Sequence, residues 1–524
     1  KDLSEKETPL YGVTAIILCV IVLFMGLESS IAPFIFVLGI AFPVAYNFGT
    51  NVFLGEVSYI TKALALVLQL GVTMDYSIFL LHRYQEEKNK TSNRDEAMSN
   101  AIQATFTSIT SSSVTTIAGF LALCAMQLTL GKDIGIVMAK GVIFGVLSTI
   151  IILPSLLMRF DKYIEKWKHP IILKEPKKLP AFLTKHYKGI LVIFLVLFIP
   201  MGYAQNHTKV YYDLSANMPQ DFASIIGTNK LKDQFHMTTT HFLLVDENLE
   251  NYQIKEICDE VEKLNGVYSV VSYESLIGGR IPTQLEPEAV KTILNNGGKK
   301  MILVNSTYRA ATDEENEQLD KIDNIMHKYD KHAVIAGEGS LTRDLITTTD
   351  IDFKMVNILS VLAIFLIIVI TFKSLALPVI LVASIEFAIC INMGIPYFTG
   401  SVLPFIASIV IGTIQLGATV DYAILMTTRY KEELSNGKPV IEAAREAAAK
   451  SAPSIITSGL SFFAACIGVS FIAKMDLIKS LCTLISRGAV ISMLVILLVL
   501  PALLIIFHKA IEKTTKGWPK ANLK

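Results

Sequence analysis

The chain has 524 residues, of which 52% are hydrophobic and only 18% are charged, and its formal net charge is +1. This composition is not that of a soluble globular protein, and the near-zero charge argues against nucleic acid as the main partner. The sequence contains no Cys-x-x-Cys pair and no Walker-type glycine loop, so neither a metal cluster nor an ATP site is predicted. No cofactor and no enzymatic activity are expected, because no nucleophile–base pair is visible.

Eleven apolar runs have about the length, ~20 residues, that a helix needs to cross a bilayer. They cover residues 10–27, 31–48, 57–82, 105–127, 131–158, 187–204, 354–373, 376–398, 402–428, 451–473 and 480–507. Lysine and arginine gather after the third and fifth runs and in the tail, which places these parts in the cytoplasm. We therefore expect a multi-pass protein of a bacterial plasma membrane, with Lys1 and residues 205–353 outside and the C-terminus inside.

The first five runs recur in the last five. Asp75-Tyr76 matches Asp421-Tyr422, and Arg83-Tyr84 matches Arg429-Tyr430 at the same offset. Both copies cross the membrane in the same direction, which indicates a parallel repeat about an axis along the membrane normal. The predicted fold class is an α-helical polytopic membrane protein built from two such helix bundles.

The predicted parts of the chain are a first five-helix repeat over 1–160, a basic cytoplasmic linker over 161–186 and a spanning helix over 187–204, followed by an outside domain over 205–353, a second five-helix repeat over 354–508 and a tail over 509–524. The linker mixes aromatic side chains with lysines, which is typical either of a segment lying on an anionic leaflet or of a solvated connection. In the outside domain, strand-like stretches at 241–245, 267–272, 301–304 and 333–335 alternate with helical spacing at 253–264 and 314–328. This order predicts a split βαβ, ferredoxin-like α/β domain.

The second repeat follows a spanning helix and an outside domain, whereas the first follows only Lys1 to Pro9. A simple duplication should begin with the same two parts, giving twelve helices in all. We expect that this sequence lacks them through truncation or divergence.

Asp75-Tyr76 and Asp421-Tyr422 lie inside apolar runs, where an ionised Asp costs at least about 2.5–3.5 kcal/mol. Neighbouring residues on a helix point about 100° apart, so the members of one pair cannot readily face each other. If the two helices pack together, Asp75 can reach Tyr422 while Asp421 reaches Tyr76. Such a site is either a proton relay or a static hydrogen-bonded clasp between helices.

Other polar residues accompany this site. Gly71 and Gly417, one turn before each Asp, are expected to let the two helices approach closely. Candidates for a polar path, each with simple helix–helix or backbone hydrogen bonding as the alternative, are Gln69, Gln415, Ser108, Ser111, Ser112, Ser454, Thr457 and Ser458. Glu386 is interpreted as a second titratable site, a substrate contact or a packed neutral glutamate. Lys140 and Arg487 are expected to extend toward the outer interface.

The two Gly-x-x-x-Asp-Tyr motifs, at Gly71–Tyr76 and Gly417–Tyr422, lie in equivalent helices of a parallel repeat that carries an outside α/β domain. This pattern resembles the resistance-nodulation-division superfamily of transporters, in its MMPL-like branch. The stretch from Met218-Pro219 to Phe235 also resembles the start of that family's second porter domain.

The resemblance implies a twelve-helix fold and proton-driven export of lipids, lipid-linked molecules or amphiphilic drugs. It also implies that Asp75, Tyr76, Asp421 and Tyr422 are the proton-relay residues. We therefore expect a secondary transporter driven by the proton-motive force, whose partners are membrane lipids and a lipid or amphiphilic substrate. A lipid- or sterol-sensing scaffold of the same fold, without transport, is the alternative.

Overall fold

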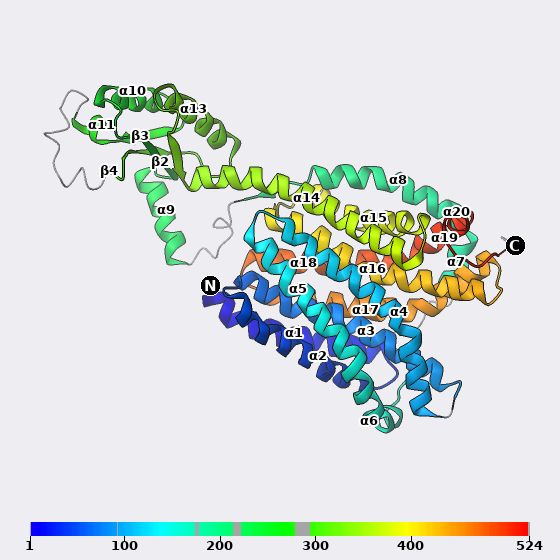
Figure 1. Ribbon diagram of the computed structural model, residues 1–524. Coiled ribbons are helices and arrows are strands. Elements are labelled where there is room, and N and C mark those ends of the chain that lie inside the picture. Colours follow the sequence, from blue (N-terminus) through cyan, green and yellow to red (C-terminus); the bar gives the residue numbers. More distant parts are fainter. Residues whose placement is uncertain (1, 92, 173–177, 213–221, 278–293, 522–524) are drawn as a thin grey trace. The chain divides into compact units, whose positions relative to one another are not determined.

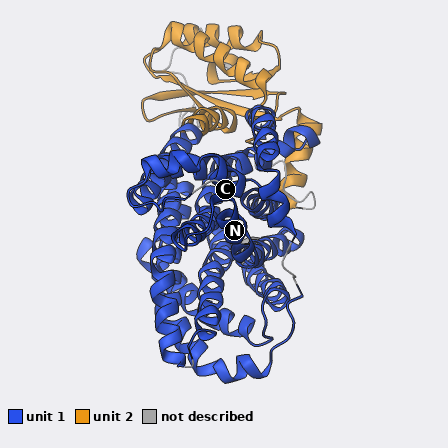
Figure 2. Cartoon of the chain, turned by 90° about the vertical axis from the view of Figure 1, so that its right-hand side faces the viewer, with its two compact units in different colours: residues 1–210, 352–524 blue, residues 211–351 orange. Residues whose placement is uncertain are grey.

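The computed structural model describes residues 2–91, 93–172, 178–212, 222–277 and 294–521 (Figure 1). The chain divides into two compact units, one of residues 1–210 and 352–524 and one of residues 211–351 (Figure 2). Among the described residues, eleven helices are long and apolar enough to cross a membrane, which confirms the predicted number.

The first repeat consists of five long helices whose ends follow local sequence signals. Ser58 Oγ accepts a hydrogen bond from Ile60 N at the start of the third helix, and Asn93 Oδ1 accepts one from Asp95 N at the start of the fourth. The elements are α1 Asp2–Gly26, α2 Ala32–Gly49, η1 Thr50–Leu54, α3 Tyr59–Lys88, α4 Arg94–Ala122, η2 Leu123–Ala125, α5 Thr129–Leu147, η3 Ser148–Ile152 and α6 Leu153–Lys166.

The second repeat matches the first helix by helix, so that α14 to α18 correspond to α1 to α5. In both copies a proline lies in the first turn of the short helix that follows the last long one, Pro154 in α6 and Pro501 in α19, where its missing N–H costs no helical hydrogen bond. The elements are α14 Glu338–Phe372, α15 Ala376–Thr399, β7 Leu403–Pro404, α16 Phe405–Ser435, α17 Val440–Ile472, α18 Asp476–Leu498, α19 Leu500–Ile506 and α20 His508–Thr514.

The connection between the repeats contains α7 Leu179–Lys185 and α8 Tyr187–Asn206. Within the predicted linker, residues 173–177 lie outside the described residues, while Tyr163, Trp167 and Phe182 are exposed. Backbone bonds from His169 N to Glu28 O and from Ile172 N to Met25 O attach this segment to the end of α1.

The repeats interlock through four central helices. In each copy the third and fourth helices pack together, α3 on α4 and α16 on α17. Across the copies, α3 packs on α17 and α16 packs on α4. Each Asp-Tyr helix therefore lies between a helix of its own repeat and a helix of the other repeat, and this arrangement places the two motifs in one common interior.

The second unit is an α/β fold with one sheet, in the order β3-β5-β2-β6 with β4 beside β5. Its strands are β2 Thr239–Asp246, β3 Val267–Val271, β4 Asn295–Asn296, β5 Lys299–Ser306 and β6 Val334–Gly337, and its helices before α14 are α9 Ala223–Phe235, α10 Asn251–Glu262, α11 Tyr273–Ile277 and α13 Asp313–Tyr329. A further short strand, β1, covers Val210–Tyr211.

Adjacent strands of this sheet are antiparallel, and α10 and α13 each connect two strands that are not neighbours. This is the split βαβ order that the alternation of strands and helices predicts. Its core is formed by Leu243, Val245, Ile257, Ile302 and Leu319, all fully buried. The start of the stretch that resembles a second porter domain, Met218-Pro219, lies outside the described residues, and its last part forms α9.

Candidate functional site

The two Asp-Tyr pairs lie midway along α3 and α16, in the interior shared by the repeats. Asp75, Tyr76, Asp421 and Tyr422 are all buried, and none is more than 1% exposed. In each of the two helices 94% of the most apolar window is buried inside the protein, more than in any other candidate membrane helix described. The motifs are therefore enclosed by protein and do not face the surroundings of the bundle.

The side chains of the two motifs meet across the repeats. Asp75 interacts with Tyr422 and with Ser458 of α17, and Ser458 Oγ donates a hydrogen bond to Tyr422 Oη at 3.1 Å. Asp421 interacts with Tyr76. This is the crossed arrangement that the sequence predicts, with each carboxyl group beside the phenol of the other copy.

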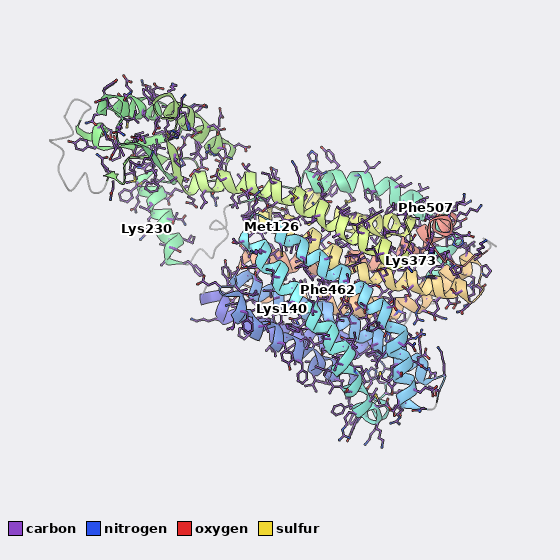
Figure 3. All side chains as sticks on the ribbon, viewed as in Figure 1. Met126, Lys140, Lys230, Lys373, Phe462 and Phe507 are labelled. Atoms are coloured by element: carbon purple, nitrogen blue, oxygen red, sulfur yellow. The ribbon has the colours of Figure 1, made fainter. Side chains whose placement is uncertain are left out.

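The two halves of the site differ at a position of the flanking helices that lies next to one of the carboxyl groups. On α4, Thr116 Oγ1 donates to Gly417 O at 2.9 Å and lies 3.4 Å from Asp421 Oδ1. The matching residue of α17 is Phe462, labelled in Figure 3, and its ring lies against Gly71 of α3. Asp421 thus has a hydroxyl group that has no equivalent at Asp75, so the repeat is symmetric in fold but not in chemistry.

Four atoms of the site complete no hydrogen bond among the described residues. They are Asp75 Oδ1, Asp421 Oδ2, Tyr76 Oη and Ser112 Oγ. An ionised carboxylate only accepts hydrogen bonds, whereas a protonated one also donates. The arrival or departure of a proton therefore changes which hydrogen bonds this interior can form, and a buried polar atom without a partner is costly enough for that change to alter packing.

The two glycines of the motifs lie at close helix crossings, but the predicted partners were wrong. Gly71 faces the ring of Phe462 on α17, not α16. Gly417 faces α4, where a Cβ atom added to Gly119 would lie only 3.1 Å from Gly417 Cα. The glycines therefore let α17 and α4 approach the Asp-Tyr helices, and the crossed side chains meet between these four helices.

Each glutamine makes its hydrogen bonds within its own repeat, in a cluster called a clasp here, and not to the aspartates. In the first copy, Asn47 Nδ2 donates to Gln69 Oε1 at 2.8 Å, and Gln69 Nε2 donates to Gly141 O at 3.3 Å. In the second copy, Asn392 Nδ2 donates to Gln415 Oε1 at 2.8 Å. The structure thus supports helix–helix hydrogen bonding, the alternative to a polar path. The two asparagines were missed in the sequence, although they recur at matching places in the runs before the glutamines.

The two basic residues near these clasps do not both extend outward as predicted. Arg487 instead binds inward, because its Nε donates to Asn392 Oδ1 at 2.8 Å and its Nη2 donates to Asn392 O at 2.6 Å. Lys140, on α5 (Figure 3), donates to Asn51 Oδ1 at 2.7 Å. The planar guanidinium group of Arg487 donates to two acceptors at once, whereas the ammonium group of Lys140 donates to one from the end of a flexible stem.

The predicted hydroxyl-bearing faces divide into groups. Ser112 lies against Asp421, and its counterpart Ser458 lies against Asp75, whereas Thr457 lies close to Gly26 of α1. Ser111 is half-buried and makes no side-chain hydrogen bond among the described residues.

Glu386 takes no part in the crossed site. It lies on α15 and lines a separate small cavity of about 20 Å³ together with Asn357, Ser360 and Gly412. Such a cavity has room for about one water molecule.

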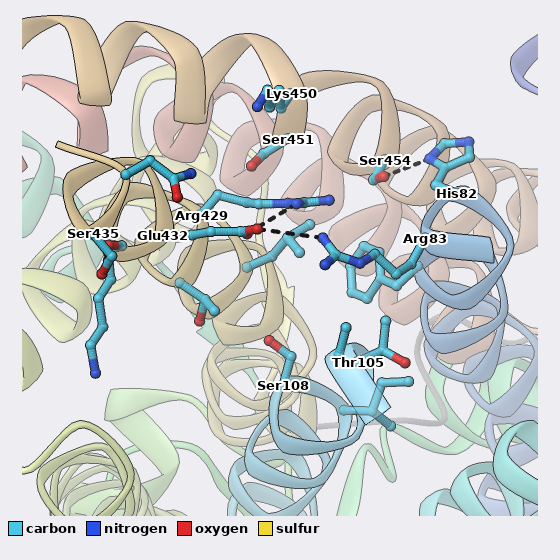
Figure 4. A pocket seen from close by; sticks show the side chains of 17 residues that line it. His82, Arg83, Thr105, Ser108, Arg429, Glu432, Ser435, Lys450, Ser451 and Ser454 are labelled. Carbon is cyan, nitrogen blue, oxygen red and sulfur yellow. Dashed lines mark hydrogen bonds and ion pairs between the residues drawn. The ribbon is translucent and has the colours of Figure 1, made fainter. Parts of the chain in front are cut away.

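A larger cavity of about 380 Å³ lies between α3, α4, α16 and α17 and begins about one turn beyond the aspartates, at Phe79 and Leu425. Ser108 and Ser454 line it, together with His82, Arg83 and Arg429 (Figure 4). His82 is a residue that the sequence reasoning missed, although it follows Asp75 by two helical turns on the same helix.

Comparison with known families matches the MMPL family over residues 1–173 and 219–522. A membrane protein of Methanocaldococcus jannaschii is 32% identical over 161 residues, which are 31% of this chain and 41% of that protein. The hopanoid transporter HpnN of Rhodopseudomonas palustris is 23% identical over 181 residues, or 34% of this chain and 21% of that protein. The matched regions thus span less than two thirds of the length of these relatives.

The structure is also similar to a solved one, the crystal structure of SecDF, a translocon-associated membrane protein from Thermus thermophilus. The TM-score is 0.64 at 14% sequence identity, and the similarity covers 96% of this chain and 62% of SecDF. At this identity the likeness concerns the fold alone.

Proposed function

The chain belongs to the MMPL family, and from this family and the buried site we propose that the protein is a secondary transporter in which proton movement drives the export of lipids or other amphiphilic molecules. The predicted family resemblance is thereby confirmed. A lipid substrate is supported by the relative that is a hopanoid transporter. In this proposal residues 211–351 form part of a porter domain outside the membrane, and the C-terminus lies in the cytoplasm.

One observation carries the proposal: the crossed Asp-Tyr site is shared between the repeats. Asp75 depends on Tyr422 of the second repeat, and Asp421 depends on Tyr76 of the first. A proton bound at either carboxyl group removes a buried charge and adds a donor, so it changes the contacts between the two halves of the bundle. A transporter of this kind needs two packings of its halves, and proton binding must change the free-energy difference between them.

The same packing between the repeats couples the site to the rest of the bundle. Because α3 packs on α17 and α16 packs on α4, a shift at the site moves both repeats. The helix α14 continues from the first unit into the second, since it covers Glu338–Phe372 without a break. α14 thus links the two units along the chain.

The test is to remove each carboxylate while keeping its shape. Asp75→Asn and Asp421→Asn are expected to abolish proton uptake, followed with pyranine trapped in liposomes, and the coupled movement of a fluorescently labelled phospholipid. Glu317→Gln is the matched control, because it makes the same chemical change on the exposed face of α13, in the other unit. Proton-coupled lipid movement that survives in either aspartate variant would contradict the proposal.

A further inference from the structure

The cavity of about 380 Å³ contacts all four central helices and lies on the side of the motifs that the lysine and arginine distribution assigns to the cytoplasm. All four helices contribute polar residues to its wall, among them His82 of α3 and Ser454 of α17. His82 and Ser454 lie side by side in this wall, and the Nδ1 atom of His82 lies 2.7 Å from Ser454 Oγ (Figure 4).

These two residues lie on the same helices as Asp75 and Ser458, His82 on α3 and Ser454 on α17. His82 follows Asp75 by two turns of α3, a rise of about 10 Å along the same helix face. Ser454 precedes Ser458 by one turn of α17, and Ser458 donates to Tyr422 Oη. Side chains at this spacing on a helix lie about 5–6 Å apart, a gap that one water molecule bridges with two hydrogen bonds.

The second repeat offers no equivalent branch. Thr428 occupies the position that matches His82, and Ser108 the position that matches Ser454, and both line the same cavity. A hydroxyl side chain has no basic nitrogen, whereas an imidazole can accept a proton at one nitrogen and release one from the other. At these matching positions, α3 and α17 thus carry a proton-accepting imidazole, whereas α16 and α4 carry two hydroxyl groups.

Charged residues from both repeats surround the cavity beside His82. Arg429 lies 2.7 Å from Glu86, and Arg83 lies 3.6 Å from Glu432, so each repeat contributes an arginine and a glutamate to the other. Glu86 and Arg429 are the charged groups that act on His82. Each arginine beside the imidazole is thus paired with a glutamate of the other repeat.

We propose that His82, positioned by Ser454, transfers protons between this cavity and the Asp75–Tyr422 half of the site. The inference rests on the proposed proton-driven function. A proton leaving Asp75 passes to the Ser458 hydroxyl, and through bridging water to the Ser454 hydroxyl. Each hydroxyl releases its own proton as it accepts one, Ser454 protonates His82 Nδ1, and Nε2 releases a proton to water in the cavity.

Chemical rescue tests this assignment. His82→Ala is expected to slow proton uptake by liposomes by about 100-fold, the usual contribution of a positioned proton-transfer group. Imidazole added on the cavity side should restore the flux, because the enlarged cavity admits it. The matched control is Thr428→Ala, the equivalent change in the second repeat, which should leave the flux unchanged.

Wild-type flux in His82→Ala, with Asp75→Asn inactive, would overturn the inference while leaving the proposed function intact. A loss that imidazole does not restore, in a protein whose melting temperature is unchanged, would assign His82 a structural role and also overturn it. Proton flux in Asp75→Asn would instead refute the proposed function itself.

Discussion

Replacing Glu315 by glutamine should reveal a pH dependence of the α/β unit that the wild-type pair of residues conceals. Glu315 of α13 and His241 of β2 are both fully buried, and their Oε1 and Nε2 atoms lie 3.9 Å apart. Burial raises the pKa of Glu315 to about 7 and lowers the pKa of His241 to about 4. The other groups that act on this pair are the backbone N–H of Ala311, Gln318 of the same helix, and Glu338 and Arg343 of α14.

The two shifts act in opposite directions on stability. Between the ordinary pKa of 4.5 and about 7, the unfolded glutamate has lost a proton that the folded one retains, so stability falls as the pH rises. Between about 4 and the ordinary pKa of 6.5, the unfolded histidine binds a proton that the folded one does not, so stability rises with pH. Each effect amounts to about 3 kcal/mol, and over most of this range they cancel.

Glu315→Gln removes only the first effect, and glutamine can still accept the hydrogen bond from Ala311 N. The free energy of unfolding of the unit should then rise by about 3 kcal/mol from pH 4 to pH 6.5. Hydrogen exchange of the β2 and β5 amides in the full chain, corrected for the intrinsic rates, measures this change.

The matched control for this prediction is Glu317→Gln, on the exposed face of the same helix and paired with Lys321. It should keep the flat wild-type profile. If the Glu315→Gln profile were as flat as that of the control, the reasoning about the buried pair would be refuted.

Two further variants test the helix contacts. Asn392→Leu leaves Arg487 without its side-chain acceptor and should destabilise the bundle by about 3 kcal/mol. Asn47→Leu, the matching change in the clasp of the first repeat, should destabilise it less. Equal losses of stability in thermal unfolding would contradict this prediction. Thr116→Val removes the hydroxyl beside Asp421 and should lower proton flux about tenfold at unchanged melting temperature; wild-type flux would show that this hydroxyl is dispensable.

Much of the architecture could be predicted from the sequence because it depends on local patterns. Apolar length predicted the eleven membrane helices, and the alternation of strands and helices predicted the order of the α/β unit. The duplicated Asp-Tyr motifs predicted that Asp75 meets Tyr422 and that Asp421 meets Tyr76, since neighbours on one helix cannot face each other.

The clasps and the partners of the glycines were not predictable in the same way. Asn47 and Asn392 are single amides in apolar runs, and only the packing of three helices brings each to its glutamine. Gly71 and Gly417 indicate a close crossing, but a glycine does not specify which helix approaches it. Helix identity at a crossing depends on contacts between residues far apart in the chain.

The sequence by itself determined that this is a duplicated membrane protein with two costly carboxylates, because hydropathy and repetition are properties of the chain alone. Only the tertiary structure decided that α4 and α17 complete the site, with Thr116 on one side and Phe462 on the other. It also brought His82 to Ser454, residues from opposite repeats, beside one cavity. The physical reason is that hydrogen bonds require distances near 3 Å, and no pattern along the chain encodes such distances between helices that different repeats supply.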